Sequence, residues 1–185
     1  MAGRIAVVDE QNRFVRWEER RRIHEERLVH RSIYAFVFEG ARALDDRLLI
    51  QLRHRDKQTF PSHWDLSCAG HVEESDYPDP AQPDHDLDAV YREVAARELE
   101  EELGVTSQLV ELAHLPPTPG VHYEQIRIFR TTASGPFQLQ AEEVEEVRFV
   151  TRAELAAMDE AGQPITNALR HFSAWLIERG EWPEA

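Results

Sequence analysis

The chain has 185 residues, a formal net charge of −14 and one cysteine. This length suits a single domain with a substantial core, predicted to span residues 1–185. The acidic charge makes nucleic acid an unexpected partner, and one cysteine excludes an internal disulfide framework and fits a reducing compartment. No apolar stretch approaches membrane-spanning length, and the start has too short an apolar run for a signal peptide, so we expect a cytoplasmic protein without membrane contact.

The order of apolar and polar segments predicts a mixed α/β fold without internal repeats. In chain order, the predicted elements are strands Ile5–Val8 and Phe14–Trp17, a charged helical or irregular segment Glu18–Arg27, strands Ile33–Phe38, Leu48–Leu52 and Trp64–Ala69, the helix Leu87–Leu103, strands Val105–Leu115, Val121–Thr131 and Val144–Val150, and the helix Thr166–Glu178. Thr151 and Glu154 have the spacing of a capping box, which opens one more short helix after the last strand.

Three glutamates on the predicted helix Leu87–Leu103 form the strongest candidate site. Glu98, Glu101 and Glu102 are spaced i, i+3 and i+4, so they share one face of the helix. Crowded carboxylates repel one another unless a cation lies between them, and hard divalent cations combine carboxylate oxygens with water and phosphate oxygens. This spacing indicates a metal site that receives a phosphate ester. The alternative is an ordinary solvated acidic face.

The residues around these glutamates carry a family resemblance. Residues 97–105, from Arg97 to Val105, resemble the second half of the Nudix box at every fixed position. Gly70 looks like the glycine that starts the box. Asp76 stands at the spacing where the pattern has glutamate, whereas counting back from Arg97 places Ala89 there.

The distance from Gly70 to Arg97 is longer than in the standard box, which predicts an inserted loop near residues 77–86, rich in proline and aspartate. The resemblance implies a Nudix-type α/β/α sandwich with a mixed sheet in a single domain. The core would cover about residues 30–150 and the box residues 70–105.

Several segments between residues 30 and 71 are similar to isopentenyl-diphosphate isomerases and to the Nudix hydrolases nearest to them. This similarity raises isomerisation as an alternative function. The isomerases have a cysteine directly before the Gly-His pair, where this chain has Ala69, and its thiol, Cys68, comes one residue earlier. Adjacent side chains on a strand point to opposite faces, so Cys68 should not substitute, and a small buried residue is the simpler interpretation. A non-catalytic ligand-binding Nudix module is a further alternative, which the complete glutamate cluster disfavours.

The resemblance also implies roles for residues outside the box. Arg53 and Lys57 match positions that bind diphosphate, although an exposed basic turn is the alternative. Glu124 matches a catalytic, metal-binding glutamate, with His122 two residues before it. His30 matches a histidine metal ligand, while His24 stands one residue from its expected place. A rival source of the general base is the acidic segment Glu142, Glu143, Glu145 and Glu146, for which a solvated loop is the default.

Together these residues predict a Mg²⁺- or Mn²⁺-dependent Nudix hydrolase acting on a small organic or nucleoside diphosphate. Glu98, Glu101 and Glu102, with the Ala69 main-chain carbonyl, would hold the metals. Glu101 or Glu124 would activate the water, and Arg97 would orient the glutamates. Arg53 and Lys57 would hold the distal phosphate. Whether the protein is a monomer or a homodimer stays open.

Overall fold

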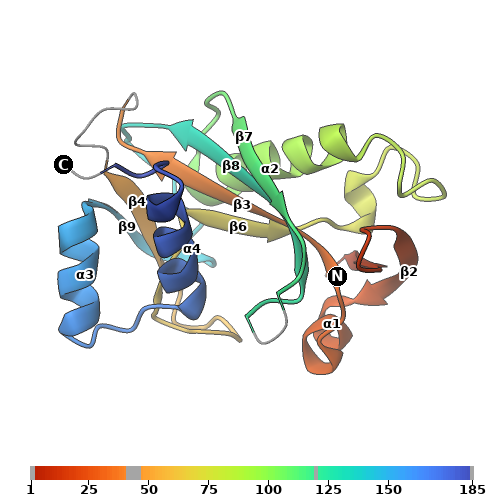
Figure 1. Cartoon of the computed structure of the whole chain (residues 1–185), viewed down its shortest axis with the longest axis horizontal. Coiled ribbons are helices and arrows are strands. Elements are labelled where there is room, and N and C mark those ends of the chain that lie inside the picture. The colour runs from red at the N-terminus through yellow and green to blue at the C-terminus, as the bar shows by residue number, and fades with distance from the viewer. Residues whose placement is uncertain (1–2, 41–46, 119–120, 184–185) are drawn as a thin grey trace. The chain divides into compact units, whose positions relative to one another are not determined.

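The computed structural model describes residues 3–40, 47–118 and 121–183. Figure 1 labels most of the elements. They are β1 (Arg4–Val8), β2 (Phe14–Glu19), α1 (Arg20–Glu26), β3 (His30–Phe38), β4 (Leu48–Arg53), β5 (Trp64–Asp65), β6 (Cys68–His71), the 3₁₀ helix η1 (Glu74–Asp76), α2 (Leu87–Leu103), β7 (Val110–Leu115), β8 (Glu124–Thr132), β9 (Val144–Val150), α3 (Arg152–Glu160) and α4 (Asn167–Glu178). The predicted α/β class with a mixed sheet is confirmed. None of the described helices is long and apolar enough to cross a membrane.

The chain clusters into two compact units that alternate along the sequence. The first unit contains the described residues of Met1–Tyr34, Ala69–Glu98 and Leu109–Phe129. The second unit contains the described residues of Ala35–Cys68, Leu99–Gln108 and Arg130–Ala185. Because each unit is assembled from three stretches, neither corresponds to a continuous half of the chain.

In the first unit, β1 and β2, both predicted as strands, form an antiparallel hairpin (red to orange in Figure 1), and β1 also pairs with β3 at Val7 and His30. Strands β6 and β8 pair with β3 as well, and β7 pairs with β8. Ile5, Val7 and Ile23 are almost fully buried and pack together with Leu28, so the hairpin and α1 share a small apolar core.

A buried arginine joins the inserted loop to the hairpin within the first unit. The side chain of Arg31, on β3, is fully buried. Its five N–H groups donate to five acceptors: the side-chain and main-chain oxygens of Asn12, the Tyr77 hydroxyl, the Pro83 carbonyl and the Asp84 carboxylate. The insert predicted near residues 77–86 is therefore an ordered part of the unit, and three of its residues accept hydrogen bonds from the Arg31 guanidinium.

In the second unit, β4 pairs antiparallel with β9 along its length, with β5 at Gln51 and Asp65, and with the end of β3. The helices α3 and α4 are the blue ribbons of Figure 1. The predicted capping box of α3 is confirmed: Thr151 and Glu154 bond each other's main-chain amides. Thr166 caps α4 and donates to Asp65 at 2.6 Å, which ties this helix to β5.

The box helix α2 has the predicted bounds, and Gly104 ends it at a φ of +69°, with its amide bonded to the Glu100 carbonyl. The prediction of one strand Trp64–Ala69 was wrong. It is broken between β5 and β6, because the Asp65 carboxylate accepts the Leu66 amide and the Ser67 hydroxyl bonds to main-chain groups of other strands. The prediction Val105–Leu115 was too long, since β7 begins only at Val110.

Candidate active site

The first unit brings two histidines and a glutamate together. Among the residues that the structure describes, His30, His71 and Glu124 form a group whose ligand atoms all lie within 4.8 Å of one another. His30 begins β3, His71 ends β6 and Glu124 begins β8, and both of the latter strands pair with β3. Two imidazole nitrogens and a carboxylate oxygen are a donor set that suits a divalent transition metal. The three glutamates of the box are not members of this group.

His30 is oriented as a metal ligand would be. Its Nδ1 lies 2.8 Å from the Leu28 carbonyl oxygen, so Nδ1 carries the proton and donates it. Nε2 is buried without a hydrogen-bond partner among the described residues, and it lies 3.6 Å from Oε1 of Glu124. Fixing one ring nitrogen by a carbonyl leaves the lone pair of the other available to an ion. The unbonded buried nitrogen therefore fits a bound metal.

A third histidine, from α1, completes the surroundings of this group. The ring centroid of His24 lies 5.3 Å from that of His71 and 6.0 Å from that of His30. Burial and the neighbouring His30 lower the pKa of His24, which keeps its imidazole in the neutral form that binds metals. Despite its one-residue offset in the sequence, the His24 ring therefore lies beside the group, although it is not one of the three residues that form it. His71, which the sequence interpretation left without a role, belongs to the group.

The glutamate Glu98 lies against the glycine that starts the box, also in the first unit. A Cβ added at Gly70 would come within 2.5 Å of Glu98 side-chain carbons, so only glycine leaves room for this carboxylate. Arg97 donates to both carboxylate oxygens of Asp76 at 3.2 Å, and pairs with Glu98 at 3.0 Å. Asp76 therefore shares Arg97 with Glu98, a contact that the alternative Ala89 has no carboxylate to make.

Gly70→Ala is expected to reduce the predicted diphosphate hydrolysis at least tenfold while changing the melting temperature little. The added methyl group meets a flexible side chain, which can rotate away, and displacing a ligand by about 1 Å can cost about a hundredfold in rate. The measurement is turnover of the folded variant. In a Glu98→Gln background the same substitution should add little, and a full additional loss there would show that Gly70 acts by another route.

In the second unit, Glu102 is a buried carboxylate with dedicated partners. Gln51 donates to Glu102 Oε2 at 3.1 Å. Burial raises the pKa of Glu102, while hydrogen bonds from Gln51 and Cys68 and the positive charges of Lys57 and Arg53 lower it in part. Cys68 is fully buried, as predicted. A desolvated carboxylate with two basic residues nearby is a suitable place for a metal and its phosphate ligands.

Arg53 and Lys57, the two residues predicted to bind the distal phosphate, lie in this same unit and have acidic partners. Arg53 bonds Asp65 at 2.9 Å and the Thr59 carbonyl at 3.0 and 3.1 Å, so its guanidinium shapes the loop after β4. Lys57 forms an ion pair with Glu143, one of the acidic residues for which a solvated loop was the default. A diphosphate at this position would compete with Glu143 for the ammonium group.

The other predicted residues are placed as follows. Glu101 is an exposed residue of α2, and Ala69 is a partly exposed residue of β6. His122 is buried and lies outside β8, in a bridge with Thr118, so the prediction that it shares a strand with Glu124 was wrong. The roles of Glu101 and Ala69 in metal binding stay predictions.

Comparison with known proteins places the chain in a family. Residues 28–176 match the model of the NUDIX domain. An uncharacterised Nudix hydrolase of Yersinia pestis is 30% identical over 184 residues, covering 96% of this chain and 87% of that protein. An isopentenyl-diphosphate Delta-isomerase of Streptomyces avermitilis is 29% identical over 181 residues, covering 94% and 79% of the two chains.

Among solved structures, DR0079 from Deinococcus radiodurans has a similar fold, with a TM-score of 0.69 and 21% identity over 88% of this chain and 92% of that one. The match to the family model covers most of the chain and includes the box helix, the inserted loop and the histidine group. The chain belongs to the Nudix family and is a Nudix hydrolase.

Proposed function

We propose that this Nudix hydrolase cleaves the phosphoanhydride bond of a small organic or nucleoside diphosphate with the help of divalent metal ions. The observation that carries the proposal is the box helix α2, whose Glu98 is accommodated by Gly70 and whose Glu102 is buried beside two basic residues. A bound divalent ion supplies Lewis acidity and lowers the pKa of water. Both properties are what phosphoanhydride hydrolysis requires.

The chain's own residues have separate tasks in this proposal. Glu98, Glu101 and Glu102 hold the metals, with the Ala69 carbonyl as a further ligand, and Arg97 orients Glu98 through its ion pair. Glu101 positions or deprotonates the attacking water. Arg53 and Lys57 neutralise the distal phosphate, for which Lys57 exchanges its Glu143 partner.

The histidine group refines the choice of metal. His30, His71 and Glu124 offer nitrogen donors, which Mn²⁺ and other transition metals accept more readily than Mg²⁺ does. We therefore assign Mn²⁺ or a related ion to this group, and Mg²⁺ or Mn²⁺ to the oxygen ligands of the box.

Isomerisation of isopentenyl diphosphate is the second candidate, favoured by the histidine group and by the similarity to the Streptomyces isomerase. The residues before Gly70 speak against it. The methyl side chain of Ala69 has no acidic proton that it could give to a substrate carbon. The Cys68 thiol is fully buried and hydrogen-bonded to Glu102. The chain lacks a thiol at the position where the isomerases carry one.

A panel of diphosphates assayed with and without added metal tests the proposal. We expect phosphate release from at least one of isopentenyl diphosphate, dimethylallyl diphosphate, ADP-ribose and nucleoside diphosphate sugars, after phosphatase treatment of the products where needed. EDTA should abolish the release and Mn²⁺ or Mg²⁺ should restore it. Since a ligand of the native state stabilises it by mass action, millimolar Mn²⁺ should also raise the melting temperature.

The control arm follows isopentenyl diphosphate by NMR for the dimethylallyl isomer. Isomer formation that is lost in Cys68→Ser would replace hydrolysis by the second candidate. No turnover of any diphosphate with any metal would contradict both enzymatic functions.

A further inference from the structure

The Glu124 carboxylate is held by two hydroxyl groups. Ser32 Oγ lies 2.7 Å from Oε1, and Tyr34 Oη lies 2.7 Å from Oε2. An ionised carboxylate only accepts, so both hydroxyls donate to it. Each oxygen of Glu124 therefore has one hydrogen bond, and rotation of the carboxylate about its terminal bond is blocked from both sides.

These hydroxyls belong to a polar row on β3. His30, Ser32 and Tyr34 alternate along the strand and so point to the same face, where all three approach Glu124. Ser32 is 1% and Tyr34 7% exposed. The two buried hydroxyls contact the Glu124 carboxylate beside His30. Any effect that they have on the site is therefore exerted by holding Glu124 in place.

The remaining geometry suits metal ligation by Glu124. Its Oε1 lies 3.6 Å from His30 Nε2, too far for a hydrogen bond. Two ligands that are each about 2.1 Å from one ion lie roughly 3–3.5 Å apart, so a small movement would let both atoms bind a shared ion. The hydroxyl bonds leave lone pairs of Oε1 and Oε2 for this purpose.

We propose that Tyr34 and Ser32 are positioning residues that fix Glu124 as a metal ligand of the histidine group. The inference rests on the proposed function, because it concerns a metal of that enzyme. Residues that orient metal ligands in this way typically contribute about 10- to 100-fold to metal affinity.

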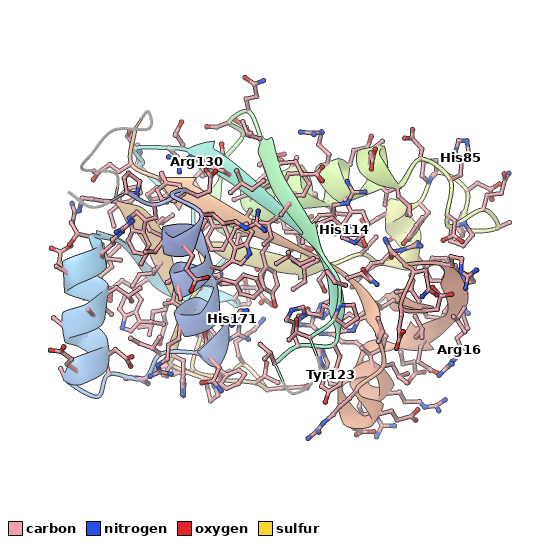
Figure 2. All side chains as sticks on the ribbon, in the orientation of Figure 1. Arg16, His85, His114, Tyr123, Arg130 and His171 are labelled. Atoms are coloured by element: carbon pink, nitrogen blue, oxygen red, sulfur yellow. The ribbon has the colours of Figure 1, made fainter. Side chains whose placement is uncertain are left out.

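The test is titration of Mn²⁺ alone into the metal-free protein by calorimetry. His71→Ala identifies the binding step that belongs to the histidine group, because that step disappears. Tyr34→Phe and Ser32→Ala should each raise the Kd of this step by about 10- to 100-fold. The matched control is Tyr123→Phe, which removes a tyrosine hydroxyl from the residue next to Glu124. The Tyr123 ring, labelled in Figure 2, lies 5.9 Å from the Arg27 guanidinium. The Kd of the Mn²⁺ step should therefore be the same in this variant as in the wild type.

A double-mutant cycle separates positioning from a merely structural role. In a Glu124→Gln background, Tyr34→Phe should change the Kd by less than about twofold, since the residue through which it acts has been altered. Melting curves confirm that each variant is folded, and Ser32→Ala keeps the test valid if Tyr34→Phe is unstable.

Three results would overturn the inference. In the first, the variants lose thermal stability but keep the wild-type Kd. In the second, Tyr34→Phe shifts the pH profile of kcat with the Kd unchanged, which would make Glu124 the base. In the third, the wild type shows no Mn²⁺ step that depends on His71. If the wild type still hydrolyses a diphosphate in that case, the proposed function stands and only the inference fails.

Discussion

Glu102→Gln is expected to lower activity and raise stability in the same molecule. Hydrolysis should fall by more than about a hundredfold, because even residues that only orient a metal ligand contribute 10- to 100-fold. At neutral pH without metal, the variant should unfold at a higher temperature than the wild type. Burial raises the pKa of Glu102, so ionising this carboxyl is less favourable in the folded protein than in the unfolded chain.

The stability difference should depend on pH in one direction. A raised folded pKa contributes stability below the ordinary value of 4.5, and this contribution is lost as the pH rises through the folded value. Glutamine cannot ionise, so the advantage of the variant should be largest at neutral pH and vanish towards pH 4. Thermal unfolding in EDTA across this range measures it.

Glu100→Gln is the matched control, since Glu100 is exposed on the same helix and is not a fixed position of the box. It should leave turnover and the pH dependence close to those of the wild type. Added Mn²⁺ should stabilise the wild type more than Glu102→Gln. Near-normal turnover of Glu102→Gln would show that this carboxylate does not hold a metal needed for the reaction.

Arg31→Met is expected to destabilise the protein by about 3–5 kcal/mol, because it removes the donor of several buried acceptors at once. Methionine fills a similar volume but donates to none of the five acceptors that Arg31 satisfies. The Asn12 and Pro83 carbonyls lose their arginine donor, and each buried unsatisfied group costs about 1–3 kcal/mol. For a chain of this size the melting temperature should fall by roughly 10 °C.

Arg13→Met is the control for this prediction. Arg13 lies in the same hairpin and pairs with Asp9, but its side chain is 71% exposed, and exposed pairs contribute about 0–1 kcal/mol. Urea unfolding of both variants gives the comparison. Equal, small effects would mean that water can replace the donors of Arg31.

The sequence predicted the elements whose signals are local. The bounds of α2 follow from its apolar spacing and from Gly104, and the capping box of α3 follows from Thr151 and Glu154. The break between β5 and β6 was missed because it arises from the side chains of Asp65 and Ser67, which bond main-chain groups of their own and other strands. A continuous run of strand-forming residues does not reveal such bonds.

The histidine group could be predicted only in part, because it too depends on contacts between residues that are distant in sequence. Its members come from strand pairing, since His71 and Glu124 lie far from His30 in sequence and meet it only because β6 and β8 both pair with β3. A signal was present in the alternation of His30, Ser32 and Tyr34, three polar residues at every second position of a strand whose other residues, apart from Arg31, are apolar. Polar residues in such a buried row need partners, and the partner is Glu124.

The network around Arg31 limits how a lineage carrying this chain can change. The hairpin supplies Asn12, the insert supplies Tyr77 and Asp84, and Asp84 also accepts the main-chain amide of Phe14. Deleting the insert would leave the buried Arg31 guanidinium without its Tyr77, Pro83 and Asp84 acceptors. Losing the arginine would leave those acceptors and Asn12 without their donor. Hairpin, arginine and insert therefore form one polar unit of this chain, in which a change to any one part leaves groups of the other two without their hydrogen-bond partners.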